Sequence, residues 1–374
     1  MELLLTIHPS YLNCYGLMED ERMHELLRKL VFADAPPGRE SEVLVIVKRE
    51  LKPLVDEMRV DALGNIIASR GGAAEQSFMI VAHQDEDWAL LVTAIDEEGY
   101  LRFTRLVGHR WNILGQRVII HGNKGKKPGI VGLTAPHIIP LEEYQRGYSP
   151  EFDQMFIDCG ARSAEEARKI GFEIGQYVTA EKHLVELPNG RLLGNCFDNR
   201  AGLVAMIEVF RRIRSERLPM RVVGVASVQE ELGTRGAGSA AFGVEPDFVI
   251  ALDVSPTGDH PNIKAGLVPV RLGEGPVLLK ADQFHVTSPL MNSWIIAVAE
   301  QHGLSLQEVA LRAPIHFGTD AAAVEVVKSG SKATSLLVPA RYFHTTNELI
   351  QYSDLEATVH LLVECIRSLG QLGE

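Results

Sequence analysis

FMIVAH, residues 78–83, is a short apolar run that ends directly in a histidine. Three other stretches have the same form and end in an acid or a histidine: VVGVASVQEE at 222–231, FVIALD at 248–253 and TSLLVPARYFH at 334–344. Runs rich in Val, Ile and Leu without polar alternation are typical of strands that are buried on both faces of a sheet. The sequence therefore predicts an α/β fold with a mixed, largely parallel sheet flanked by helices.

The polar residues at the ends of these runs are expected to lie close together, because such sheets bind ligands at the carboxyl ends of their strands. They are two imidazoles, His83 and His344, and three acids, Glu230, Glu231 and Asp253. One such residue alone is most simply a polar side chain where the chain returns to solvent. Four runs of the same form in one chain favour a metal centre instead.

Asp198 adds a further acid, in GNCFDNRAGLVAMIEVFRRI at 194–213, directly before a helical pattern with one apolar face. As a plain N-cap it needs no other explanation. With the two histidines, Asp253 and one of the two glutamates, however, it completes a set of two imidazoles and three carboxylates that suits two divalent ions. Two roughly tetrahedral ions with an open position each need about six protein bonds, so one of the five residues has to be shared.

Glu230 and Glu231 are expected to have different roles, because adjacent side chains at a strand end point in different directions. One would bind metal, and the other would take the proton as water attacks a carbonyl. Asp85 lies on the same side of an extended chain as His83. We expect its carboxylate to accept the second ring N–H of His83, the alternative being a solvent-facing acid.

Composition excludes several classes of function. The 374 residues carry a net charge of −12, whereas nucleic acids and anionic membranes both require a basic patch. No apolar segment approaches the ~20 residues of a membrane span. Four scattered cysteines without CxxC spacing are typical of reduced thiols, which predicts a cytoplasmic protein.

The pattern along the chain changes after the apolar run that ends in His83. Residues 89–108 and 116–133 are apolar or alternating runs separated by Gly-bearing turns, which predicts hairpins. Helix and buried-strand alternation resumes near Asp198. We therefore predict a β-rich domain, residues 88–180, inserted into an α/β domain made of residues 1–87 and 181–374.

Five motifs carry a resemblance to a known family: AHQDE, CFDNRAG, QEELGTRGA, ALDVSPT and PARYFHTTNE. In this order and spacing they resemble the dinuclear metallo-aminopeptidases of the glutamyl-aminopeptidase and tetrahedral-aminopeptidase type, some of which also carry an endoglucanase label. The resemblance extends from about Glu21 through the rest of the chain, including DALGN at 61–65 and FGTDAAAV at 317–324. It implies a zinc-exopeptidase-like fold.

The resemblance also implies which residues hold metal. His83 and Asp253 would hold one ion, Glu231 and His344 the other, and Asp198 would bridge them. The cofactor would be two divalent ions per chain, zinc or cobalt first and manganese as an alternative, since the same ligands accept all three. The inserted domain would correspond to the family's dimerisation domain, which gives a homo-oligomer, either a dimer or a dodecamer.

In the same resemblance, Glu230 would be the general base and Asp85 the support for His83. Three features depart from the family pattern, and one of them is an N-terminal extension of roughly 20 residues that precedes the shared region. Asp87 and Trp88 replace the usual apolar residue and glycine, and Asn199 stands where many members have a second Asp. None of these changes removes a ligand or the base, so they bear on specificity and assembly.

The expected activity is removal of N-terminal residues from short peptides with a free amine. A related deacylase or carboxypeptidase is the enzymatic alternative. An endoglucanase activity is less consistent with these residues, because it needs two carboxylates that face each other across a sugar. Three residues are candidates for the substrate pocket: Thr319, Asp320 and Arg341. Alternatively, Thr319 and Asp320 form a polar turn, and Arg341 pairs with a nearby acid.

Overall fold

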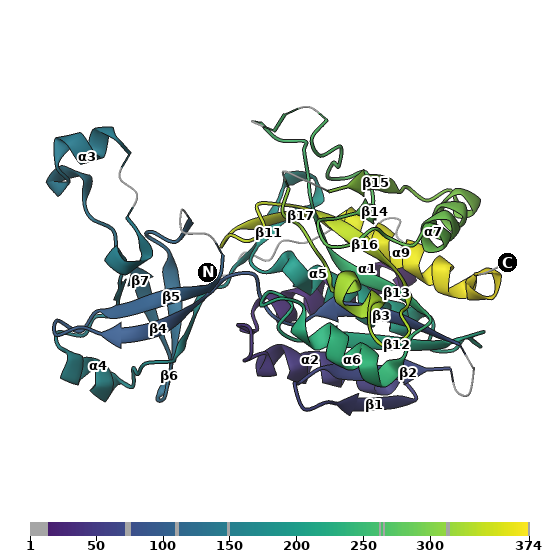
Figure 1. Cartoon of the computed structure of the whole chain (residues 1–374), viewed down its shortest axis with the longest axis horizontal. Coiled ribbons are helices and arrows are strands. Elements are labelled where there is room, and N and C mark those ends of the chain that lie inside the picture. The colour runs from purple at the N-terminus through teal and green to yellow at the C-terminus, as the bar shows by residue number, and fades with distance from the viewer. Residues whose placement is uncertain are drawn as a thin grey trace.

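The computed structural model describes residues 14–71, 76–108, 112–147, 150–261, 263–264, 266–311 and 315–372. It contains a large α/β part and a smaller barrel, which lie side by side in Figure 1. In the described part of the chain, no helix is both long and apolar enough to cross a membrane.

The α/β part is built on an eleven-stranded sheet with nine strands in the order β1-β2-β12-β3-β13-β16-β17-β11-β10. Their bounds are, in the same order, Glu57–Val60, Ile66–Arg70, Arg221–Ser227, Ser77–His83, Phe248–Pro256, Lys332–Arg341, Glu348–Gln351, Arg191–Gly194 and Leu184–Leu187. β14 (Val277–Ala281) pairs with β16 and with β15 (Gln307–Ala310). The expected mixed α/β fold is confirmed: the central strands β12, β3, β13 and β16 are parallel, and the strands on either side of them in this order pair antiparallel. β14 is antiparallel to β16 and parallel to β15.

Helices cover both faces of this sheet, which explains why its central strands are largely apolar. Phe78 and Ile80 of β3 face a large core that is covered by α1 (Cys14–Val31), α2 (Ser41–Leu51), α5 (Phe197–Arg212), α7 (Pro289–His302) and α9 (Tyr352–Arg367). Met79 and Val81 face the opposite core, under α6 (Arg235–Val244) and α8 (Asp320–Glu325). Consecutive residues therefore alternate between two buried faces, as a helix-covered sheet requires.

The barrel is closed in the order β4-β5-β8-β7-β6-β9. These strands span Ala89–Ile95, Leu101–Val107, Ile157–Asp158, Gly125–Val131, Arg117–Gly122 and Tyr177–Ala180. The two expected hairpins are β4 with β5 and β6 with β7. Two short helices accompany the strands, α3 (Leu141–Gln145) and α4 (Ala164–Ile170), and α3 projects from the barrel in Figure 1. All six strands lie within the predicted insertion, whose boundaries as a domain stay a prediction.

Polar contacts fix the barrel against the α/β part. Asp34, between α1 and α2, accepts hydrogen bonds from Lys126 of β7 at 2.7 Å and from Thr179 of β9 at 3.0 Å. Lys182, just after β9, forms a buried ion pair with Glu86, just after β3. Trp88 packs in the barrel core against Gly108, whose φ of +92° and close contact with the indole leave no room for a side chain. The barrel is thus tied to the segment that follows His83.

Candidate active site

The parallel strands place the candidate ligands at one edge of the sheet. His83 ends β3, Glu230 and Glu231 follow the end of β12, and His344 follows the end of β16. One expectation was wrong: Asp253 does not end its strand, because β13 continues to Pro256. The apolar run stops at Asp253 while strand pairing with β16 continues beyond it.

Asp198 lies between two pairs of side chains. Its Oδ1 is 3.0 Å from Nε2 of His83, and that nitrogen is 3.8 Å from Oδ1 of Asp253. Its Oδ2 is 3.6 Å from Nε2 of His344, which is 3.4 Å from Oε1 of Glu231. All five candidate ligands are therefore brought together, and each oxygen of Asp198 faces a different histidine.

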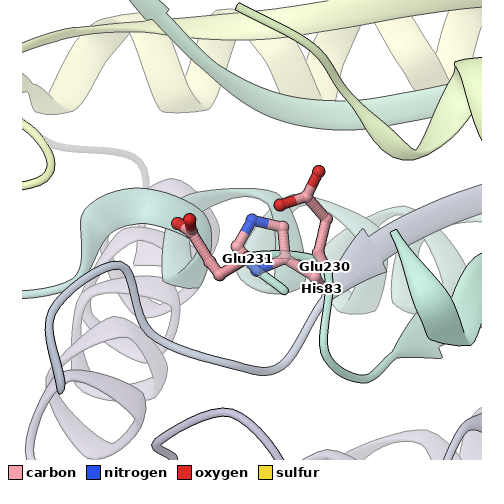
Figure 2. Close-up of side chains that lie close together, drawn as sticks. All are labelled: His83, Glu230 and Glu231. Carbon is pink, nitrogen blue, oxygen red and sulfur yellow. The ribbon is translucent and has the colours of Figure 1, made fainter. Parts of the chain in front are cut away.

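Glu230 and Glu231 extend to different sides of the His83 ring, as Figure 2 shows. Each nevertheless offers a carboxylate oxygen within 4.8 Å of a ring nitrogen of His83. Burial raises the pKa of both glutamates well above the usual range, and burial with the nearby Asp198 raises the pKa of Asp253 to about 6. Buried carboxylates this close together are stable in ionised form only when cations lie between them. The donor set, imidazole nitrogens and carboxylate oxygens, suits divalent ions.

Asp85 supports both His83 and the two glutamates. Its Oδ1 lies 3.5 Å from Nδ1 of His83, and its carbonyl oxygen lies 3.2 Å from the same nitrogen. Its two carboxylate oxygens accept the backbone N–H groups of Glu230 and Glu231, each at 3.0 Å. One buried acid therefore orients the histidine and fixes the loop that carries the paired carboxylates.

Three buried polar side chains that the sequence reasoning missed hold the same loops. Glu348 accepts the backbone N–H groups of Cys196 and Asp198 at 2.5 and 3.0 Å. Glu40 accepts that of Gln229 at 3.2 Å. Asn65 bonds the main chain of Val228 and of Gly236. Glu348 and Asn65 were inside the quoted motifs, but they act on main-chain groups far away in sequence, which residue spacing does not reveal.

The positions that depart from the family pattern have distinct settings. Asp87 is fully buried, and one of its oxygens accepts the backbone N–H of His344. Burial raises the pKa of Asp87 to about 7. Asn199 donates to the carbonyl of Leu252 at 2.7 Å and accepts the N–H of Gly202 at 3.0 Å. Asn199 therefore links the start of α5 to the strand residue that precedes Asp253.

The three candidates for the substrate pocket all have partners within the protein. Thr319 is buried, caps α8 and bonds Ser335 at 2.8 Å. Asp320 is buried, accepts a hydrogen bond from Ser227 at 2.5 Å, and has its pKa raised to about 7 by burial. Arg341 forms an ion pair with Asp259 at 2.6 Å, which is the alternative considered for it. Their role in substrate binding stays a prediction.

A comparison with family models identifies residues 64–361 as an M42 glutamyl aminopeptidase region. The chain belongs to this family. M42 peptidases are metal-dependent, and the chain brings histidine and acidic groups together where such ions would bind.

Individual M42 relatives are similar in sequence to this chain over nearly its whole length. It is 36% identical over 341 residues to FrvX of Escherichia coli K12, which carries an aminopeptidase name, covering 90% of this chain and 93% of that one. It is 33% identical to the lysyl aminopeptidase of Pyrococcus furiosus, covering 92% and 97%.

Solved structures show the same similarity in three dimensions. A TET aminopeptidase from a marine sediment archaeon of the Thaumarchaeota superposes with a TM-score of 0.89 at 33% identity, covering 94% of this chain and 97% of that one. The TET1 peptidase of Pyrococcus horikoshii, which can assemble into a tetrahedron or a large octahedral shell, superposes with a TM-score of 0.81 at 29% identity, covering 92% and 99%.

Proposed function

We propose that this M42 peptidase is a dinuclear aminopeptidase that removes N-terminal residues from short peptides. The observation that supports two ions is the position of Asp198, whose Oδ1 lies near His83 and whose Oδ2 lies near His344, while Asp253 lies near His83 and Glu231 near His344. His83 and Asp253 would hold one ion, and Glu231 and His344 the other, with Asp198 shared. Zinc, cobalt and manganese all accept these donors.

When bound, such ions supply Lewis acidity toward a carbonyl oxygen and make water more acidic. Glu230 is the group that would take the proton from the attacking water, because it lies beside His83 and is not needed as a ligand in this assignment. The new C–O bond forms at the scissile carbonyl, the C–N bond breaks, and Glu230 passes the proton to the leaving amine. Asp85 keeps Glu230 in place by holding its backbone N–H.

The acids around the site also suit the substrate's ammonium group. A deacylase or carboxypeptidase would use the same carboxylates, so the free amine is the feature that separates the proposals. An endoglucanase is disfavoured, because Glu230 and Glu231 are adjacent and extend to different sides of the His83 ring, whereas the carboxyl pair of a glycosidase faces each other across a sugar.

Activity is expected to require a free substrate amine and two ions per chain. The test reloads metal-free protein stepwise with zinc, cobalt or manganese and measures metal content together with cleavage of a panel of aminoacyl chromogenic substrates. The same substrates with an acetylated amine are the matched control, and we expect them to be cleaved at least ~100-fold more slowly, since the buried acids would then face no ammonium. Equal cleavage of both sets, or full activity with one ion, would contradict the proposal.

We also propose that the chain forms a homo-oligomer through the barrel, of which the dimer is the basic unit. The region around α3 supports this, because it projects from the barrel and carries exposed apolar side chains, Leu133, Ile138, Leu141 and Tyr144, at 57, 75, 69 and 55% exposure. An apolar group of this kind, on a projecting element, marks an interaction surface. Homo-oligomers are usually closed and symmetric.

The double substitution Ile138→Asp with Leu141→Asp is expected to convert the assembly to monomers, because two charges would be buried at the contact. Light scattering at micromolar concentration measures the change in mass. Val326→Asp is the control, since Val326 is 73% exposed but follows α8, which packs against α6 and against β3, β13 and β16 of the α/β part. A wild-type protein that is monomeric, or a double variant that keeps the wild-type mass, would refute the proposed interface.

A further inference from the structure

Asp87 is a buried acid with only part of its hydrogen-bonding capacity used. Its Oδ2 accepts the backbone N–H of His344. Within the described ranges, its Oδ1 has no hydrogen-bond partner, although the side chain is fully buried. A buried carboxylate oxygen without a partner is costly, so this atom needs a cation or a donor.

The surroundings of Asp87 indicate a cation. One oxygen each of Asp87 and Asp198 and one ring nitrogen of His344 all lie within 4.8 Å of one another. This group matches in size and donor type the group formed by His83, Asp198 and Asp253 on the other side of Asp198. Asp198 thus belongs to two sets of three potential ligands, one around each histidine.

The other acid and the thiol near Asp87 are already engaged. Both oxygens of Glu348 accept backbone N–H groups, from Cys196 and Asp198. The sulfur of Cys196 lies 3.0 Å from the ammonium group of Lys182 and 3.2 Å from Glu86. These two residues therefore do not compete with His344 and Asp198 as partners of a cation bound by Asp87.

We propose that Asp87 is an additional ligand of the ion that Glu231 and His344 would hold with Asp198. This inference rests on the proposed dinuclear site. It makes the two ions unequal: the ion at His344 has four protein ligands, whereas the ion at His83 has three, with Asp198 counted for both. A fourth protein ligand leaves less room for water or substrate, so the ion at His83 is the more open of the two.

A second role for Asp87 has to be separated from ligation, because it also holds the backbone of His344. Asn112, which follows β5 in the barrel, offers the matched comparison. Its side-chain amide donates to the carbonyl oxygen of His344 at 3.0 Å, and its own carbonyl accepts from Trp88 at 3.4 Å. Asn112→Ala therefore loosens the same peptide segment without removing a potential ligand.

The test is calorimetric titration of metal-free protein with zinc, together with the visible absorption of the cobalt-loaded protein. We expect Asp87→Asn, which keeps an acceptor for the His344 N–H, to lower the affinity for one ion by at least about 10 to 100-fold, the effect seen even when an outer partner of a ligand is lost. The cobalt spectrum should change for that ion alone. Asn112→Ala should leave both affinities close to wild type.

Asp282→Asn is a control for removing a buried acid. Asp282 is also buried, one of its oxygens accepts the N–H groups of Phe284 and His285, and the other lacks a partner among the described residues. It belongs to none of the ligand groups found there. We expect this variant to bind both ions as the wild type does. Asp87→Val, which places an apolar residue at the position, gives a second measurement of the lost ligand should Asp87→Asn not fold.

Wild-type affinity for both ions in Asp87→Asn would overturn the assignment. An equal loss in Asn112→Ala would also overturn it, because the effect would then come from the position of His344. A wild-type protein that takes up no ions would refute this inference and the dinuclear site together. A wild-type protein that takes up two ions but cleaves no peptide would refute only the proposed activity, and the affinities of Asp87→Asn would still decide the role of Asp87.

Discussion

Asp198→Ala is expected to remove both ions and abolish turnover, the largest effect of any single substitution in this protein. The reason is that each oxygen of Asp198 faces one histidine, His83 at 3.0 Å and His344 at 3.6 Å. Each proposed ion would lose a ligand, and the two cations would repel each other without a shared carboxylate between them. Metal analysis after dialysis, combined with a turnover assay at saturating metal, measures both effects.

Asp253→Ala is the control for that experiment, because Asp253 lies near His83 and only on that side of Asp198. It should lower the affinity for one ion by about 10 to 100-fold or more and leave the other ion bound as in the wild type. The melting temperatures of the metal-free variants separate loss of metal from loss of the fold. An Asp198→Ala protein that still binds one ion with wild-type affinity would show that this carboxylate is not shared.

The central sheet could be predicted from sequence because burial on both faces leaves a plain signature. Phe78 to Ala82 are all apolar, and in the structure they alternate between the two helix-covered cores. The antiparallel flanks had no such signature, since strands such as β10 and β17 are short and lie toward the edge. The end of β13 was misjudged for a related reason: the apolar run stops at Asp253, but backbone pairing does not depend on side-chain polarity.

The residues that point into the site were predictable, whereas those that hold its backbone were not. His83 ends its strand and His344 follows the end of another, so their positions follow from the strand pattern. Glu348, in contrast, acts on the N–H of Asp198 across 150 residues of sequence. Such a contact depends on loop conformations that residue spacing does not encode. For Arg341 the sequence left two alternatives open, and the ion pair with Asp259, which is one of them, is visible only in the structure.

Asp87 shows how a departure from a motif becomes informative only in three dimensions. In sequence it is one of three acids, Asp85, Glu86 and Asp87, any of which could face solvent. In the structure all three are buried and each has a different task. Asp85 holds the glutamate loop, Glu86 pairs with Lys182 at the junction with the barrel, and Asp87 reaches the backbone of His344.

Glu230→Gln is expected to lower the rate of peptide cleavage by about 10² to 10⁴ while both ions stay bound, because glutamine keeps the shape of the side chain but cannot accept the proton.

Glu231→Gln is the matched control, since the two residues are adjacent, both are held through their N–H groups by Asp85, and both offer an oxygen near His83. Glu231 also forms a close pair with His344, at 3.4 Å. Weakening that ligand should lower the occupancy of one ion, and the loss of activity should be partly recovered by excess metal. No amount of metal should restore the Glu230 variant. Metal titration followed by turnover at each occupancy measures the difference. If the Glu230 variant loses an ion while the Glu231 variant stays fully loaded, the ligand is Glu230 and the base is Glu231.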